Sequence, residues 1–122
     1  MKYLKYLDIS DTSVGGNPSA LHLKWLETFK ASACPLKGSI AGNLFDSLVT
    51  LDVASTLISR VDSIPSKCRS LLLADIGSMS FAPGLLRHAA ENYIFVDLRN
   101  VNFTNRSESW SLVHGSFFLW LV

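Results

Sequence analysis

LKYLDI, at Leu4–Ile9, decides the fold because it returns twice at a constant distance. Its counterparts are LETFKA at Leu26–Ala31 and LVTLDV at Leu48–Val53, so the three blocks begin at equal intervals along the chain. Counted from the first residue of each block, apolar residues occupy places 1, 4, 6 and 11, and a small or polar residue occupies place 9. A shared pattern at a fixed period indicates an internal repeat.

Two looser copies and one incomplete copy follow these three blocks. The copies start near positions 4, 26, 48, 68, 93 and 117, so the successive steps are 22, 22, 20, 25 and 24. In the fifth copy, Tyr93 and Ile94 precede the strand-like segment FVDL, and Tyr93 is assigned to place 1. In the incomplete copy, Phe117, Trp120 and Val122 are assigned to the inward places 1, 4 and 6.

Places 4 and 6 fall on one face of a strand because strand side chains alternate with a period of two. One such strand cannot bury its apolar face by itself, so neighbouring copies are expected to stack around a continuous core. The predicted strands, all parallel, are Tyr6–Ile9, Thr28–Ala31, Thr50–Val53, Ser70–Leu73 and Phe95–Leu98. The residues expected to be buried in them are Leu7, Phe29, Leu51, Leu73 and Val96.

This template resembles the leucine-rich repeat family, whose pattern is LxxLxLxxNxL with a period in the twenties. The resemblance covers nearly the whole chain. It implies an α/β fold: a right-handed solenoid with short parallel strands on a concave face and mixed helical, 3₁₀ and extended segments on the convex face. It also implies one domain over residues 1–122, which we expect to be a segment of a longer array.

Within the family, Leu36–Ile40 (LKGSI) resembles the LxGxI of the plant-type extracellular subclass, and Ile64-Pro65 keeps only a later dipeptide of that motif. This partial match favours an ectodomain origin without deciding the compartment. Asn102-Phe103-Thr104 and Asn105-Arg106-Ser107 also match the N-glycosylation pattern, which supports secretion only weakly.

The segments that return from one strand to the next are expected to differ in kind. Helical signals occur at Ser19–Trp25 and at Leu85–Asn92, with a turn signal at Ser107–Val113. Gly, Pro and Ser in Gly38–Asp46 and Arg60–Lys67 predict extended or 3₁₀ returns.

Place 9 departs from the family pattern, which usually has Asn there to satisfy backbone groups of the turn. Thr12, Cys34 and Thr56 can form hydrogen bonds, whereas Ile76 and Val101 cannot. We therefore expect the last two copies to turn less regularly or to satisfy those groups by other means.

The resemblance implies that ligands bind to the concave face, where one residue from each copy contributes to a column. Place 3 holds Tyr6, Thr28, Thr50, Ser70 and Phe95, and place 5 holds Asp8, Lys30, Asp52, Leu72 and Asp97. Place 7 holds Ser10, Ser32, Ala54, Ala74 and Arg99, and place 8 holds Asp11, Ala33, Ser55, Asp75 and Asn100. This hydroxyl-rich, mildly acidic face suits a protein or peptide partner with basic groups.

Composition and motifs argue against other functions. With 17% charged residues, a formal net charge of +1 and no basic stripe, the chain has no electrostatic signature of nucleic-acid binding. His22, His88 and His114 have no metal-ligand spacing, and no serine lies in a G-x-S-x-G motif. No stretch approaches the roughly 20 apolar residues that span a bilayer. The sequence therefore predicts no catalysis, no cofactor, no metal site and no membrane span.

Two other functions remain open. Leu71–Gly77 has some likeness to the strand and turn of a nucleotide-binding enzyme, although it has one glycine where a phosphate-binding loop needs several. The chain could also be a structural segment of a longer array that contacts no ligand.

Cysteines and the chain ends give two more expectations. Cys34 and Cys68 lie at places about 10 Å apart along the predicted stack, too far for a disulfide, so both are expected to be buried free thiols. Self-association through uncapped ends is expected, especially through Phe117–Val122.

Overall fold

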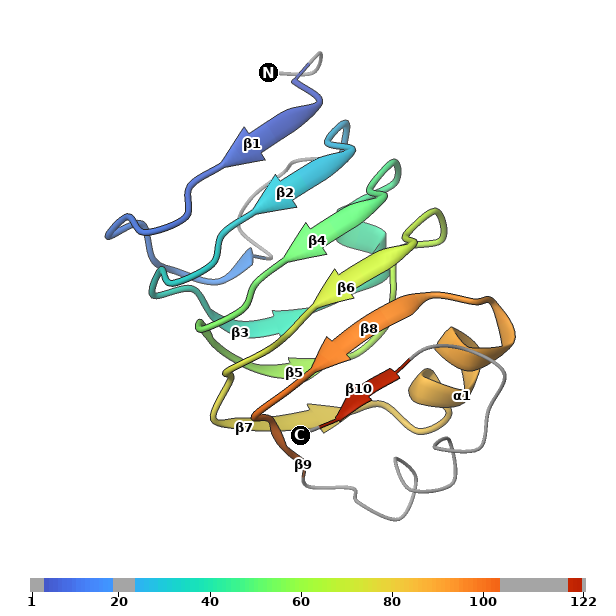
Figure 1. The fold of residues 1–122 in the computed structure, drawn as a ribbon. Coiled ribbons are helices and arrows are strands. Elements are labelled where there is room, and N and C mark those ends of the chain that lie inside the picture. Colours follow the sequence, from blue (N-terminus) through green and yellow to red (C-terminus); the bar gives the residue numbers. More distant parts are fainter. Residues whose placement is uncertain (1–3, 19–23, 104–118, 122) are drawn as a thin grey trace.

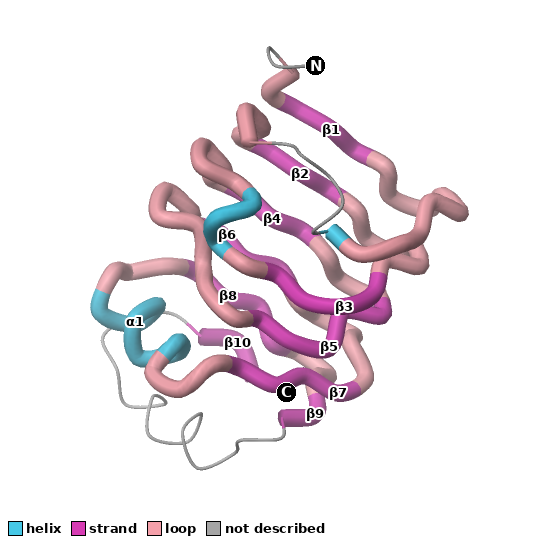
Figure 2. The backbone as a smooth tube through the Cα atoms, turned by 180° about the vertical axis from the view of Figure 1, so that it is seen from behind, coloured by secondary structure: helices cyan, strands magenta, loops and turns pink. Residues whose placement is uncertain are grey.

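Parallel strands in two sheets and one α-helix form an α/β fold in the part of the chain that the structure describes. The computed structural model describes residues 4–18, 24–103 and 119–121. In this part of the chain, a six-stranded sheet has the order β1-β2-β4-β6-β8-β10, and a four-stranded sheet has the order β3-β5-β7-β9. The larger sheet lies in front of the smaller one in Figure 1, and Figure 2, seen from behind, has the smaller sheet in front.

Five of the six strands in the larger sheet are the ones that the sequence predicts. They are β1 (Tyr6–Asp8), β2 (Thr28–Lys30), β4 (Thr50–Asp52), β6 (Ser70–Leu72) and β8 (Phe95–Leu98). The pairing is parallel throughout and keeps the repeat register, so Leu7 lies opposite Phe29, Phe29 opposite Leu51, and Leu71 opposite Val96. The expectation of five parallel strands in this register is confirmed.

The last strand of this sheet corrects one sequence assignment. In β10 (Leu119–Leu121), Leu119 pairs with Val96 and Trp120 pairs with Asp97, so Leu119 occupies the register position that was assigned to Trp120. With this one-residue shift, Leu119 pairs with Val96 and Leu121 pairs with Leu98, so that apolar residues lie opposite each other. The assignment of Trp120 to place 4 is therefore wrong, and Phe117 and Val122 lie outside the described residues.

The four-stranded sheet is formed by the return segments. Its strands are β3 (Lys37–Ile40), β5 (Leu57–Val61), β7 (Ser78–Phe81) and β9 (Asn102–Phe103). Extended returns were expected at Gly38–Asp46 and Arg60–Lys67, but their pairing into a sheet was not. The register of β3 with β5 shifts after Gly38, whose φ of +102° favours glycine.

Two helical elements complete the returns. A short 3₁₀ helix, η2 (Gly42–Leu44), follows β3. The helix α1 (Leu85–Glu91) confirms the predicted helix at Leu85–Asn92 and buries Leu85, Leu86, Ala89 and Ala90. The helix expected at Ser19–Trp25 and the turn at Ser107–Val113 fall wholly or mostly outside the described residues; Lys24 and Trp25 form a turn.

The core lies between the two sheets and is filled by the repeat places. Phe29, Leu51, Leu73 and Val96 are completely buried, as expected. Leu7, the fifth residue of that prediction, is only partly buried, because β1 has a neighbouring strand on one side only. Cys34 and Cys68 are buried free thiols, as expected, and burial raises the pKa of the Cys68 thiol.

The fifth copy also departs from its predicted alignment at place 1. Tyr93 is 71% exposed, whereas the following residue, Ile94, is buried. The reason is the end of α1: Tyr93 adopts a left-handed φ of 56°, and the N–H groups of Tyr93 and Ile94 donate to the carbonyls of Ala90 and Ala89. This is a Schellman helix end, which turns Ile94 into the core and Tyr93 outward.

Candidate functional site

The backbone turns that follow β1, β2, β4, β6 and β8 share one feature, a left-handed residue at place 8. These place-8 residues, which all have φ between 56° and 60°, are Asp11, Ala33, Ser55, Asp75 and Asn100. In the first four, the N–H group donates a 2.9 Å hydrogen bond to the place-7 carbonyl of the next copy. The turn of the fourth copy is thus as regular as those before it, and the turn of the fifth shares their left-handed φ.

Place 9 has a smaller role in the turn than the sequence suggested. Thr12, Cys34 and Thr56 each donate to the carbonyl three residues earlier, at 2.6, 3.0 and 2.7 Å. Ile76 cannot do so, yet Asp75 before it keeps the left-handed φ, and its N–H donates to the Arg99 carbonyl of the adjacent copy, as the equivalent N–H groups of the first three copies do to the copy next to theirs. The hydrogen bond between copies is present whether or not place 9 carries a donor, so it holds these turns independently of that side chain.

The regular turns align the predicted site residues on one face of the six-stranded sheet, which we call the outer face. Strand pairing places Tyr6, Thr28, Thr50, Ser70 and Phe95 in one row and Asp8, Lys30, Asp52, Leu72 and Asp97 in a second. Beyond the strand ends, Ser32 N–H donates to Ser10 Oγ at 3.1 Å, which joins two place-7 residues. The structure therefore brings the candidate residues together by rows.

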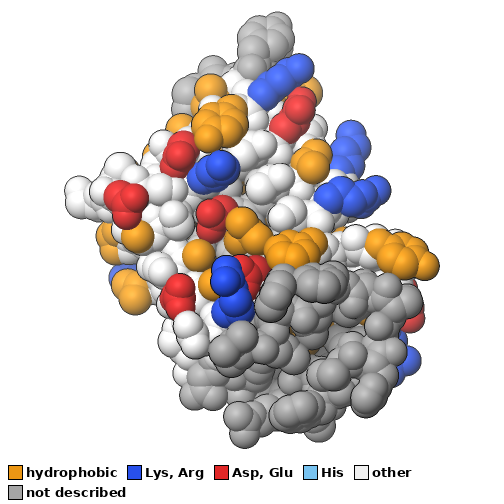
Figure 3. Space-filling view, in the orientation of Figure 1, with side chains coloured by type: hydrophobic (Ala, Val, Ile, Leu, Met, Phe, Trp, Pro, Cys, Tyr) orange, Lys and Arg blue, Asp and Glu red, His pale blue; other side chains and the backbone are white. Residues whose placement is uncertain are grey.

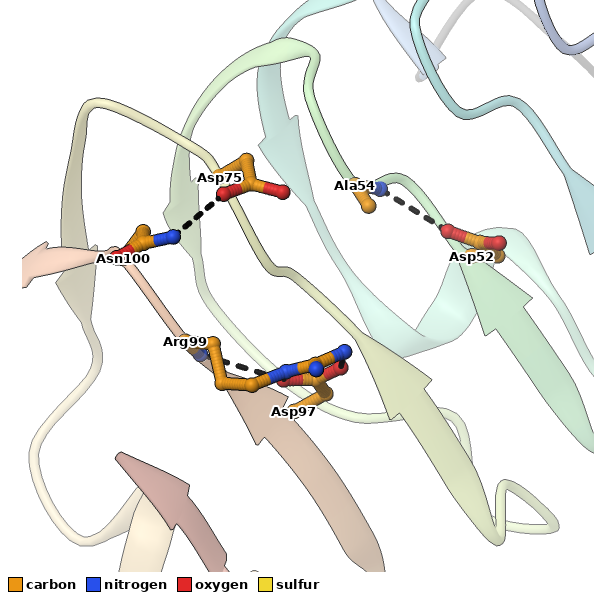
Figure 4. A network of polar contacts seen from close by, with 6 residues as sticks. All are labelled: Asp52, Ala54, Asp75, Asp97, Arg99 and Asn100. Carbon is orange, nitrogen blue, oxygen red and sulfur yellow. Dashed lines mark hydrogen bonds and ion pairs between the residues drawn. The ribbon is translucent and has the colours of Figure 1, made fainter. Parts of the chain in front are cut away.

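Most residues of the outer face are partly or fully accessible, and the exceptions are Ala74 and Asp97. Asp97 was expected to point into solvent but is buried, because the Arg99 side chain lies against it. Arg99 Nε donates to Asp97 Oδ1 at 2.9 Å, and Arg99 Nη2 donates to Asp97 Oδ2 at 2.7 Å (Figure 4). This guanidinium holds the pKa of the Asp97 carboxyl below its usual value.

Charged and hydrophobic side chains are interspersed with polar ones on this face (Figure 3). At its first strand, Tyr6 is 55% exposed and the Lys30 ammonium lies 5.8 Å from the centre of its ring. Hydrophobic side chains gather over β6 and β8, where the rows contain Leu72 and Phe95. The Ser10 hydroxyl and backbone N–H lower the pKa of the Asp8 carboxyl.

Sequence reasoning missed two polar contacts of this face. These are the Asp97–Arg99 pair and a cross-copy bond in which Asn100 Nδ2 donates to Asp75 Oδ1 at 2.9 Å (Figure 4). The first depends on where the long Arg99 side chain lies, which the sequence pattern does not decide. The second requires the strand register, because its partners belong to different copies of the repeat.

Other candidate sites are weaker. A hollow of about 160 Å³ between Thr56–Ser59 and Ile76–Ser78 is smaller than the roughly 300–1,000 Å³ of typical small-molecule sites. His88 lies on α1, and no group of metal-binding side chains occurs within residues 4–18, 24–103 and 119–121. His22, His114 and Asn105 fall outside these ranges, and Asn102 pairs with Ser78 in the smaller sheet.

Comparison of this chain with protein-family models, with curated proteins and with solved structures finds no match. Within the described part of the chain, no helix has the length and apolar character needed to cross a membrane. The outer face is thus the candidate site by its own geometry.

Proposed function

We propose that this chain is a protein- or peptide-recognition module, built as a right-handed leucine-rich repeat solenoid, and that it is not an enzyme. The observation that carries the proposal is the in-register alignment of aromatic, charged and hydroxyl side chains, most of them partly or fully accessible, over neighbouring strands of the outer face. Such a face presents a broad surface with apolar and polar groups, which protein interfaces require.

The backbone supports the solenoid part of this proposal. Equivalent places of consecutive copies pair with each other, for example Tyr6 with Thr28 and Thr28 with Thr50. The left-handed turn recurs at the same interval, since Asp11, Ala33 and Ser55 are spaced along the chain as Tyr6, Thr28 and Thr50 are. Stacked units that contact only their neighbours are the architecture of repeat proteins.

The nucleotide-binding alternative has little support in the local structure. Leu71–Gly77 runs from β6 through a left-handed turn at Asp75 toward β7. Phosphate groups are usually bound at the N-terminus of a helix, and this segment is followed by a strand instead. A purely structural role in a longer array remains the main competitor of recognition.

Selection of peptides would test the proposed function. A phage-displayed library of random peptides is selected on the full chain, and the resulting peptides are titrated against two variants. Thr50→Trp places a bulky side chain in the middle of the outer face, and Ser59→Trp places the same side chain on exposed β5 of the smaller sheet.

Recognition through the outer face predicts that Thr50→Trp weakens binding about tenfold or more, which corresponds to about 1.4 kcal/mol. Ser59→Trp should leave binding unchanged. Failure to select any saturable binder, or equal losses in both variants, would favour the structural role over recognition.

A further inference from the structure

Three aspartates of the outer face are held in the same way by the backbone. Asp8, Asp52 and Asp97 all occupy place 5, and each accepts a hydrogen bond through Oδ1 from the N–H group two residues later. The distances are 2.9 Å from Ser10 N, 3.1 Å from Ala54 N and 3.2 Å from Arg99 N. Figure 4 shows this contact for Asp52. One carboxylate oxygen of each is thereby fixed by the backbone. Asp97 also accepts from the Arg99 side chain and Asp8 from the Ser10 hydroxyl.

The Asp97–Arg99 pair shows one kind of partner that a place-5 carboxylate of this face can bind. Its guanidinium contacts both oxygens of Asp97, in the two-bond geometry that makes arginine–carboxylate pairs specific. Arg99 comes from place 7 of its own copy, but place 7 is Ser10 beside Asp8 and Ala54 beside Asp52. Neither residue carries a cation, and among the described residues Asp8 and Asp52 form no ion pair.

The charge of the outer face favours a cationic partner. Its places 3, 5, 7 and 8 contain five carboxylates against two cations, Lys30 and Arg99, which leaves a net charge of −3 in a chain whose total is +1. Lys30 lies between Asp8 and Asp52 in the row, but its ammonium lies over the Tyr6 ring and makes no ion pair within the described residues.

The spacing of the two carboxylates limits the shape of the partner. Asp8 on β1 and Asp52 on β4 are separated by one strand, β2, so they are roughly 10 Å apart along the sheet. A polyproline II peptide rises about 3.1 Å per residue and has three residues per turn, so side chains three residues apart point the same way about 9.3 Å apart. Such a peptide matches the spacing of the carboxylates.

We propose that the outer face binds an extended, arginine-bearing peptide whose guanidinium groups, three residues apart, pair with Asp8 and Asp52 as Arg99 pairs with Asp97. Leu72, opposite Asp52 on the adjacent strand, and Phe95 supply apolar contacts for the aliphatic part of a bound side chain. This assignment rests on the proposed function, because it specifies the partner of the same face.

The test uses the full chain and two fluorescein-labelled hexapeptides, Pro-Arg-Pro-Pro-Arg-Pro and its matched control Pro-Gln-Pro-Pro-Gln-Pro, in fluorescence anisotropy at low salt. The arginine peptide should bind saturably and the glutamine peptide should not. Asp52→Asn should weaken binding roughly fivefold, since an exposed ion pair contributes up to about 1 kcal/mol. Asn can still accept the Ala54 N–H bond, and Asp46→Asn, an exposed residue outside this face, is the control of equal charge.

A gain of affinity provides a second readout that misfolding cannot imitate. Lys30→Ala removes a cation beside both carboxylates and should strengthen binding of the arginine peptide. Equal binding of both peptides, absence of saturable binding, or equal effects of Asp52→Asn and Asp46→Asn would overturn the assignment. If library peptides without basic residues bind through the outer face, recognition stands and the arginine assignment fails; if no peptide binds there, both fail.

Discussion

The first and third copies of the repeat have nearly the same sequence pattern but different surroundings. Leu51 and Val53 of the third copy are completely buried, whereas Leu7 and Ile9, at the same places of the first copy, are only partly buried. Likewise, Thr56 is buried and its counterpart Thr12 is exposed, although both hydroxyls donate to the carbonyl three residues earlier. Burial in this fold is therefore a property of the stack rather than of one copy.

The largest expected difference between the two copies concerns their place-4 leucines. Leu51→Ala should lower the free energy of unfolding by about 2–5 kcal/mol, because it opens a cavity flanked by strands on both sides. Leu7→Ala should cost about 1 kcal/mol, since its side chain is already partly in water. Urea titration of both variants measures the difference, and equal losses would show that the core is not organised as a one-dimensional stack.

A smaller difference is expected at place 9. Thr56→Val keeps the shape of the side chain but leaves the buried Val53 carbonyl without its 2.7 Å bond, at a cost of about 1–2 kcal/mol. Thr12→Val removes the same bond in an exposed turn, where water replaces it, and should change stability by a few tenths of a kcal/mol. Equal destabilisation of the two variants in thermal unfolding would show that water does not replace the lost hydrogen bond at Thr12.

The comparison extends to the fifth copy, where a helix leads into the strand. Tyr93 holds a left-handed φ of 56° that costs a non-glycine residue about 1 kcal/mol. Tyr93→Gly should therefore be more stable than Tyr93→Ala by roughly that amount, since both remove the exposed ring but only glycine relieves the strain. Equal melting temperatures of these two variants would argue against the helix end described for Ala89–Ile94.

The smallest effect concerns acid stability. The folded-state pKa of Asp97 is lowered by Arg99, so its contribution to stability is complete above the unfolded-state pKa of about 3.9 and is lost as pH falls through the folded value. Asp97→Asn should therefore lose less stability between pH 6 and pH 3 than the unmodified chain does. Arg99→Ala should show the same weaker dependence of the free energy of unfolding on pH. If this dependence is unchanged in both variants, the Asp97–Arg99 pair does not contribute to it.

The strands of the larger sheet were predictable because each carries apolar residues at places 4 and 6, which only a stacked strand can bury. The smaller sheet was not, since segments such as Leu57–Val61 show short apolar runs without a cue to their pairing. The repeat places assigned to Tyr93 and Trp120 were each wrong by one residue. At Tyr93 the end of a helix changes the spacing between repeat places, and before β10 the step between copies differs from the one assumed.

The sequence was sufficient to predict which residues share a row of the candidate face, because the repeat period determines which residues lie opposite each other on neighbouring strands. Its internal pairing was not, since the burial of Asp97 depends on where the long Arg99 side chain lies, and no alternation rule decides that. The two carboxylates without such a partner, Asp8 and Asp52, became distinguishable from Asp97 only through these contacts.

The central claim is that equivalent places of successive copies become neighbours on one accessible sheet face, and cysteine cross-linking tests it most directly. Thr28 and Thr50 lie opposite each other on adjacent strands, whereas Thr28 and Phe95 lie three strands apart, at roughly 14 Å. With the shortest bifunctional methanethiosulfonate reagent, Thr28→Cys/Thr50→Cys should cross-link within the chain, and Thr28→Cys/Phe95→Cys should not. Efficient cross-linking of the second pair, or none of the first, would contradict the claim.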